Sequence, residues 1–95
     1  MRPTLLSDEE IAVMLTSFPL WFLEQGQLTR TAVAKDFHTA MQWVDAIAEV
    51  AEAMDHHPDI DIRWTKLRVS VMTHDKEGLT TLDFELAARV DRICL

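Results

Sequence analysis

The sequence predicts an α+β fold in which three helices pack on one face of a four-stranded antiparallel sheet. Three observations favour this class. One stretch of eighteen residues carries apolar side chains at helical spacing, a pair of short strand-like runs stands on each side of it, and capping signals precede helical stretches near both ends. The predicted order is αββαββα, in a single domain over residues 1–95. Each strand pair can close as a hairpin and each helix has one apolar stripe, so covering one sheet face is the economical arrangement.

A capping box begins the first predicted helix. Ser7 stands at the N-cap position and Glu10 follows three residues later, so each side chain can bond the other residue's backbone N–H. The apolar residues behind this box recur at helical steps, and they are Ile11, Met14, Leu15 and Phe18. Pro19 ends the helix because proline offers no backbone N–H and clashes with the preceding turn.

The first predicted hairpin follows this helix. Residues 21–23 form a short apolar run, residues 24–27 contain a glycine suited to a turn, and residues 28–34 return as a second strand with weak alternation.

The clearest helix of the sequence lies in the middle of the chain. Asp36 is its predicted N-cap, and residues 37–54 carry one continuous apolar face. That face comprises Phe37, Ala40, Met41, Val44, Ile47, Ala48, Ala51 and Met54. The triplet His56-His57-Pro58 stops the helix.

A second hairpin follows the histidine pair. Ile60, Ile62 and Trp64 alternate with charged residues, the chain turns near residues 65–66, and a second alternating run continues through residues 67–72. Alternation of this kind predicts two antiparallel strands with one buried face.

The last predicted helix begins after Gly78. Thr80 and Asp83 form a third capping signal, and Leu79 is placed to pack against Phe84 as a hydrophobic staple. The expected buried stripe of this helix comprises Leu82, Leu86, Val90 and Ile93.

Composition excludes several classes of protein. Hydrophobic residues make up 48% of the chain and only two glycines and three prolines occur, which is typical of a globular domain. A net charge of −7 argues against binding to phosphate backbones, so nucleic acid is not an expected partner. The single cysteine, Cys94, excludes an intrachain disulfide and any zinc site built on paired cysteines.

No segment predicts a membrane span or a secretory signal. The apolar run over residues 11–23 follows acidic residues, where a signal peptide needs positive charge, and it contains Pro19. No window reaches the roughly 18 to 20 apolar residues of a membrane helix. We therefore expect a cytoplasmic protein without a membrane partner.

Three histidines are the candidate reactive groups. His56 and His57 are adjacent, so their side chains point in different directions, and His74 closes the second strand of the second hairpin. The unperturbed pKa of histidine, about 6.5, lets the imidazole give or take a proton near neutral pH. We hypothesise that the three histidines meet around one small ligand.

Other roles are open for the same residues. A histidine at a helix end can bond free carbonyls, and Asp83 can cap a helix without further function. His56, His57 and His74 with Asp55 or Asp75 supply enough donors for zinc. Neighbouring histidines seldom fit one tetrahedral site, however, and no His-x-x-x-His or Cys-x-x-Cys spacing occurs, so no metal ligand is predicted.

The spacing of these groups is specific. In order, the set comprises Glu52, three residues, His56-His57-Pro58, five residues, Trp64, nine residues, His74, eight residues and Asp83. This series resembles the signature of the pterin-4a-carbinolamine dehydratase family, and the predicted order of elements resembles the fold of that family. The resemblance covers almost the whole chain.

The resemblance implies an activity. Members of the family dehydrate 4a-hydroxytetrahydropterin to quinonoid dihydropterin and water, which recycles a tetrahydrobiopterin-type cofactor. The resemblance implies no cofactor, because the pterin is the substrate, and no metal. It implies that His56 and His74 carry out the proton transfers and that His57 positions the pterin. Which histidine is the acid and which is the base stays open.

The resemblance also assigns supporting roles. Substrate contacts are expected from Pro58, Thr73, Asp75, Lys76 and Trp64, with Trp64 forming part of the pocket wall. Groups expected to orient the imidazoles and raise their pKa are Glu52, Asp55 and Asp83.

Partners can be expected on two grounds. A small domain with a sheet edge tends to associate, and the resemblance implies a homo-oligomer, either a dimer or a tetramer. Some relatives act as dimerisation partners of a transcription factor, so the alternative function is a non-catalytic interaction protein of the same fold. The sequence does not indicate which pterin side chain is physiological.

Overall fold

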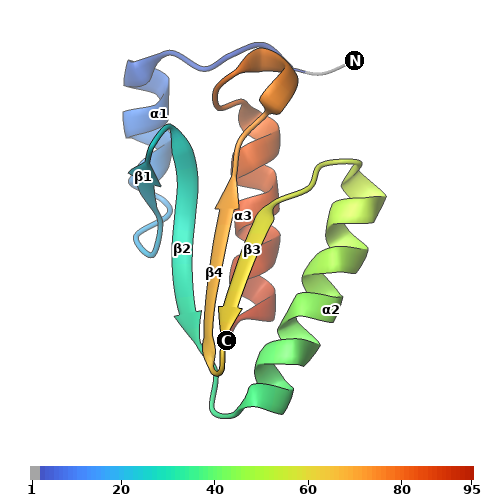
Figure 1. Ribbon diagram of the computed structural model, residues 1–95. Helices are drawn as coiled ribbons and strands as arrows, with labels where there is room; N and C mark the ends of the chain where they lie inside the picture. The colour runs from blue at the N-terminus through green and yellow to red at the C-terminus, as the bar shows by residue number, and fades with distance from the viewer. Residues whose placement is uncertain (1–2) are drawn as a thin grey trace.

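The predicted order of elements is confirmed. A computed structural model describes residues 3–95 of the chain (Figure 1). The elements are α1 (Asp8–Leu15), β1 (Phe22–Glu24), β2 (Gln27–Val33), α2 (Phe37–Met54), β3 (Asp59–Arg63), β4 (Lys66–Val71), the short 3₁₀ helix η1 (His74–Lys76) and α3 (Thr81–Ile93).

The four strands form one antiparallel sheet in the order β1-β2-β4-β3. The central pair is the longest, and it runs from Leu28 opposite Val71 to Val33 opposite Lys66. The helices lie on one side of this sheet, as the predicted fold class requires (Figure 1). Within residues 3–95 no helix combines the length and the apolar content that a membrane crossing needs.

Alternation along β4 builds the core, as predicted. Leu67, Val69 and Val71 are buried, whereas Lys66 is exposed and Arg68 is half-buried. Facing helical residues from α2 and α3 complete the core, and they include Ile47, Ala51, Phe84, Leu86, Ala87 and Val90. The predicted apolar face of α2 is only partly covered, because Phe37 and Met41 stay exposed.

Two predicted boundaries are wrong by a few residues. The first helix ends at Leu15, and hydrogen-bonded turns carry the chain through Phe18. The second hairpin turns at Trp64 and Thr65, one residue earlier than predicted. Trp64 therefore leaves the strand and takes a left-handed backbone conformation, with φ at 54°.

A buried arginine on β2 was not predicted. The Arg30 guanidinium donates to the Asp91 carboxylate at 2.5 Å and to the Cys94 carbonyl at 3.1 Å. The Trp21 indole N–H donates to the same Asp91 oxygen at 2.9 Å. These contacts fasten the end of α3 to β2 and to the chain before β1. Burial in this region raises the pKa of the Cys94 thiol.

The cap of α2 generates a prediction about pH. Hydrogen bonds from the Thr39 side chain and backbone N–H hold the pKa of the Asp36 carboxyl below its usual value. The contribution of Asp36 to stability is therefore present above the unfolded pKa of about 3.9 and is lost as pH falls through the lower folded pKa. We expect Asp36→Ala to lower the melting temperature at pH 7 and to match wild type near pH 2. Thermal unfolding followed by circular dichroism measures both, and a gap between the two proteins that persists in strong acid contradicts the assignment.

Candidate active site

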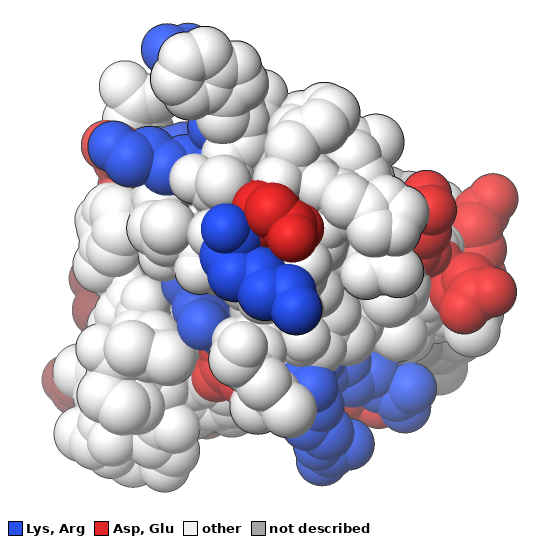
Figure 2. All heavy atoms as spheres, turned by 90° about the horizontal axis from the view of Figure 1, so that it is seen from below, with Lys and Arg blue, Asp and Glu red and all other residues white. Residues whose placement is uncertain are grey.

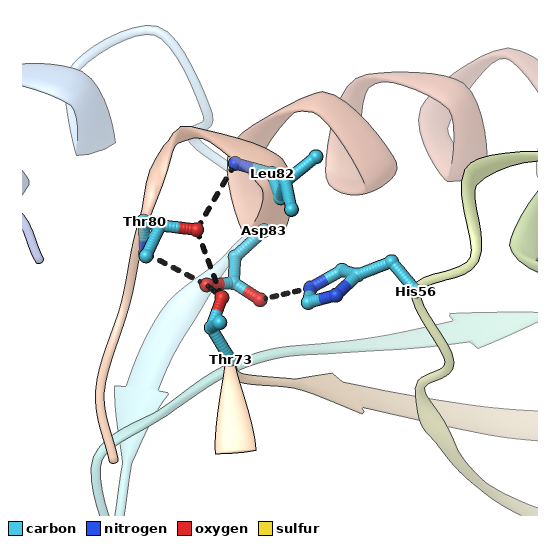
Figure 3. A network of polar contacts seen from close by, with 5 residues as sticks. All are labelled: His56, Thr73, Thr80, Leu82 and Asp83. Atoms are coloured by element: carbon cyan, nitrogen blue, oxygen red, sulfur yellow. Dashed lines mark hydrogen bonds and ion pairs between the residues drawn. The ribbon is translucent and has the colours of Figure 1, made fainter. Parts of the chain in front are cut away.

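The carboxylate of Asp83 is the centre of the site. Asp83 is the third residue after the N-cap Thr80, and the two form the predicted capping box of α3. Its side chain is fully buried. One oxygen, Oδ2, accepts from the Thr80 backbone N–H and from the Thr73 hydroxyl, both at 2.8 Å (Figure 3). The positive end of the helix dipole also favours a carboxylate at this position.

His56 binds the other oxygen of Asp83. Asp55 ends α2 in a left-handed conformation, with φ at 50°, and the His56 backbone N–H then donates to the Ala51 carbonyl. This turn directs the His56 ring inward, where its Nε2 lies 2.6 Å from Asp83 Oδ1 (Figure 3). An ionised Asp83 can only accept, so it holds the proton of a neutral His56 on Nε2.

Two threonine hydroxyls complete the buried network. The Oγ1 atoms of Thr73 and Thr80 are 2.8 Å apart, and the Leu82 N–H donates to Thr80 Oγ1. Because Thr73 donates to Asp83, Thr80 donates to Thr73. Across residues 3–95 no buried side-chain nitrogen or oxygen lacks a hydrogen-bond partner.

This placement corrects one predicted role. We expected Thr73 to contact the substrate, but Thr73 is fully buried and its hydroxyl serves Asp83 and Thr80. Its backbone N–H and carbonyl are bonded within the following loop. Thr73 therefore anchors the network and has no surface for a ligand. The alternation of β4 indicates the burial of Thr73 in the sequence, because residue 73 continues the inward positions 67, 69 and 71. A polar side chain at such a position needs a buried partner.

His57 faces outward from the same turn. Its Nε2 lies 2.7 Å from Glu52 Oε2, and both side chains are more than half exposed. The predicted role of Glu52 in orienting a histidine thus concerns His57. Pro58 follows at the start of the path into β3 and is half-buried.

His74 lies on a short loop fixed at its base. Thr73 and Gly78 form an isolated bridge, with the Thr73 N–H donating to the Gly78 carbonyl at 2.8 Å. Between them, η1 carries His74, Asp75 and Lys76, all exposed. Because Thr73 also bonds Asp83, the loop that carries His74 is tied to His56 through one carboxylate.

The structure brings some predicted residues together and leaves one apart. His56, Thr73 and Asp83 are in contact, and their chain neighbours His57 and His74 are exposed at the same end of the sheet. Trp64 lies beyond the far end of β3 and is 84% exposed. A single chain therefore does not place Trp64 in the wall of a pocket with the histidines.

The metal alternative finds no support in the geometry. Within residues 3–95 no three side chains of histidine, cysteine, aspartate or glutamate lie close enough together to hold an ion. The reason is local. His56 is bonded to Asp83 and His57 is bonded to Glu52, so the two adjacent histidines point in different directions.

The site and fold define a class of protein: an α+β domain with one histidine held on a buried carboxylate and two histidines exposed beside it. The family model described as pterin 4 alpha carbinolamine dehydratase matches residues 4–93. The chain therefore belongs to the pterin 4 alpha carbinolamine dehydratase family, as the resemblance predicted.

Relatives match over nearly their full length. A protein of Nocardia farcinica is 43% identical over 93 residues, which covers 98% of each chain. One of Chloroflexus aurantiacus is 47% identical over 88 residues, which covers 93% of this chain and 95% of the relative. Both are named, provisionally, as pterin-4-alpha-carbinolamine dehydratases.

Solved structures are similar as well. The crystal structure of a transcriptional coactivator/pterin dehydratase from Brucella melitensis has a TM-score of 0.92 at 30% identity and covers 97% of this chain and 100% of its own. A pterin dehydratase-like RuBisCO assembly factor of the alpha-carboxysome has a TM-score of 0.66 at 20% identity and covers 78% of this chain and 86% of its own, and this likeness shows the fold alone.

The buried network predicts that substitution of Asp83 lowers the stability of the fold more than substitution of the exposed Glu52. Asp83→Ala leaves His56 and two buried donors without an acceptor, so we expect a loss of about 3–5 kcal/mol in the free energy of unfolding. Asp83→Asn keeps one acceptor but places an amide NH₂ against a donor, so it also destabilises. Glu52→Gln changes an exposed contact and should stay within about 0.5 kcal/mol of wild type. Urea unfolding measures all three, and equal losses at positions 83 and 52 would contradict the buried role.

Proposed function

We propose that this protein dehydrates 4a-hydroxytetrahydropterin to quinonoid dihydropterin and water, and so recycles a tetrahydrobiopterin-type cofactor. The observation that carries the proposal is the contact of Asp83 with both His56 and Thr73, because these two residues directly precede the exposed His57 and His74 and so fix both of their segments. Membership of the dehydratase family supports it. The cytoplasmic location stays a prediction.

The reaction needs one acid and one base. The bond between C4a and its hydroxyl breaks, the acid protonates the departing hydroxyl to give water, and the base removes the proton from the adjacent ring nitrogen. Those two proton transfers leave the total charge unchanged. A positioned acid or base typically contributes about 10²–10⁴-fold to the rate.

Burial leads us to revise the roles of the histidines. We expected His56 to transfer a proton and His57 to position the pterin. His56 is only 4% exposed and its Nε2 is held by Asp83, whereas His57 and His74 are exposed. We therefore assign proton transfer to His57 and His74, with Glu52 orienting His57, and positioning to His56.

The remaining pterin contacts are assigned to the same end of the sheet. Pro58 adjoins His57, and Asp75 and Lys76 follow His74 on η1. Their carboxylate and ammonium groups suit the donors and acceptors along the edge of a pterin ring. Asp55 contributes through its left-handed backbone, which sets the directions of the two histidines.

Alanine substitutions test the revised roles. We expect His57→Ala and His74→Ala each to lower kcat by about 10²-fold or more, with little change in melting temperature, because both side chains are exposed. His56→Ala should lower the melting temperature as well, because it removes a buried partner of Asp83. Stopped-flow assays with chemically generated 4a-hydroxytetrahydropterin measure the rates. Near-normal rates in both exposed variants would refute the assignment.

Chelators should leave turnover unchanged. His56 and His57 are each bonded to a carboxylate in different directions, so the histidine pair does not form one ligand set. We expect the same rate before and after dialysis against EDTA or dipicolinate. Activity that falls on dialysis and returns with stoichiometric zinc would favour the metal alternative.

A non-catalytic interaction protein is the second candidate. The similar Brucella melitensis protein is titled a transcriptional coactivator as well as a pterin dehydratase, and α2 here leaves Phe37 and Met41 exposed at 54% and 37%. The wild-type assay separates the two functions, because a protein that only binds partners does not accelerate the dehydration above its uncatalysed rate.

A further inference from the structure

The outer face of the sheet carries a cluster of cations beside the β3–β4 turn. The helices cover the opposite face, so this one is open (Figure 1). Figure 2 views the molecule from the end at which the turn lies, and Lys and Arg side chains are exposed on that end. Three cations, a carboxylate and a hydroxyl line a hollow of about 380 Å³ there, and they belong to Arg63, Lys66, Arg68, Asp61 and Thr31. The whole chain has nine lysines and arginines against sixteen acidic residues, so this hollow concentrates positive charge in an acidic protein.

The strand register places these groups side by side. Arg63 and Lys66 are paired at the end of the hairpin, and Arg68 follows two residues later on the same face. In its own row, Arg68 stands between Asp61 on β3 and Thr31 on β2. Like charges directly opposite each other destabilise an antiparallel pair, so the fold itself does not account for the pairing of Arg63 with Lys66.

Carboxylates neutralise the cluster only in part. Arg63 Nε donates to the Asp61 carboxylate at 3.2 Å, and Arg68 forms an ion pair with Glu24. Within residues 3–95 Lys66 makes no ion pair. The lining of the hollow combines three cations with one carboxylate, which leaves a surplus of two positive charges, and Glu24 offsets part of it from outside the lining.

This arrangement fits a phosphate monoester better than a carboxylate. A phosphate monoester carries about −1.5 to −2 charge at pH 7 and three acceptor oxygens, whereas a carboxylate carries one charge and two oxygens. Each guanidinium, on Arg63 and on Arg68, offers a planar fork of donors, and Lys66 adds a compact ammonium. The Thr31 side chain is exposed beside them, so its hydroxyl can donate one further hydrogen bond.

An apolar surface adjoins the cations. Val33 is the partner of Lys66 on β2 and is 64% exposed, and Trp64 directly follows Arg63 and is 84% exposed. The volume of the hollow also falls within the range of about 300–1,000 Å³ that is typical of small-molecule sites. The space therefore suits an organic group attached to the phosphate, which can cover exposed apolar side chains.

The net charge of −7 does not prevent such binding. At physiological ionic strength salt screens exposed charges beyond about 8 Å, so a compact anion interacts mainly with the nearest cations. A nucleic acid would extend beyond the cluster over an acidic surface. The charges favour a small ligand over a polymer.

We propose that the outer face of the sheet beside the β3–β4 turn binds the phosphate monoester of a small organic molecule, with the phosphate between Arg63, Lys66 and Arg68. The site lies at the other end of β3 from His57, six residues of extended chain or roughly 20 Å away. It is therefore separate from the histidines, and it does not rest on the proposed function.

Binding is measured by NMR on isotope-labelled wild-type protein at constant ionic strength. Phenyl phosphate should shift the amide signals of Thr31 and of residues 63–68. Inorganic phosphate should shift the same signals with lower affinity, and benzoate, which has the ring but one charge, should bind more weakly than phenyl phosphate. Shifts confined to the histidine segments, or shifts that sodium chloride reproduces, would overturn the site.

Two further ligands decide the class of molecule that is bound. Inorganic phosphate that binds as tightly as phenyl phosphate would overturn the choice of an ester and leave a site for the free ion. A single-stranded DNA oligonucleotide that displaces phenyl phosphate at a lower concentration of phosphate groups would overturn the choice of a compact ligand.

Matched substitutions separate the hollow from the net charge of the protein. Lys66→Gln and Arg68→Gln should each raise the Kd for phenyl phosphate about fivefold or more, because each removes a charged donor. Lys66 is exposed, so its variant should fold as wild type does. Arg89→Gln removes the same charge from an exposed position of α3 and should leave the Kd unchanged. Equal weakening by Arg89→Gln would show a general effect of charge and overturn the proposal.

Asp61 allows a test of opposite sign. Its carboxylate lines the hollow and repels an anion, so Asp61→Asn should bind phenyl phosphate more tightly than wild type. Asp45→Asn removes a carboxylate from an exposed position of α2 and should leave the Kd unchanged. No gain in Asp61→Asn, or an equal gain in both variants, would contradict the placement of the phosphate.

Discussion

A carboxylate inside a protein has to replace the water that it loses, and here the Asp83 carboxylate does so with three hydrogen bonds. Its partners are His56, Thr73 and Thr80, which lie two residues after α2, two residues after β4 and at the N-cap of α3. One buried charge thus sets the positions of three segments. Because each missing donor would leave that charge short of a partner, the fold and the site depend on the same contacts.

The same arrangement gives two adjacent histidines different surroundings. The left-handed Asp55 ends α2, and the chain beyond it is extended, so His56 points to the interior and His57 to solvent. The inner ring is fixed by Asp83. The outer ring can exchange protons with water and with a ligand, which acid-base catalysis requires. A rigid support and a reactive group therefore come from consecutive residues.

Much of the fold was predictable because its signals are local. Ser7, Asp36 and Thr80 each accept the capping bond expected of them, and the buried residues of β4 alternate as the sequence indicates. The turn at Trp64 was misplaced because an apolar residue continues the alternating pattern there, and a left-handed φ leaves no mark in that pattern. The burial of Arg30 was missed because it depends on Asp91, which lies 61 residues away.

The sequence by itself determined the elements, their order and the set of residues able to carry the chemistry. Short-range forces decide these features, since periodicity and capping act over three or four residues. Only the tertiary structure decided that His56 is the buried histidine, that the Thr73 hydroxyl bonds Asp83 rather than a ligand, and that Trp64 lies at the other end of the sheet from the histidines. The contact between His56 and Asp83 joins residues 27 apart in the chain. The packing of α2, α3 and the sheet brings such residues together, and no local propensity encodes which of two neighbouring side chains will face inward.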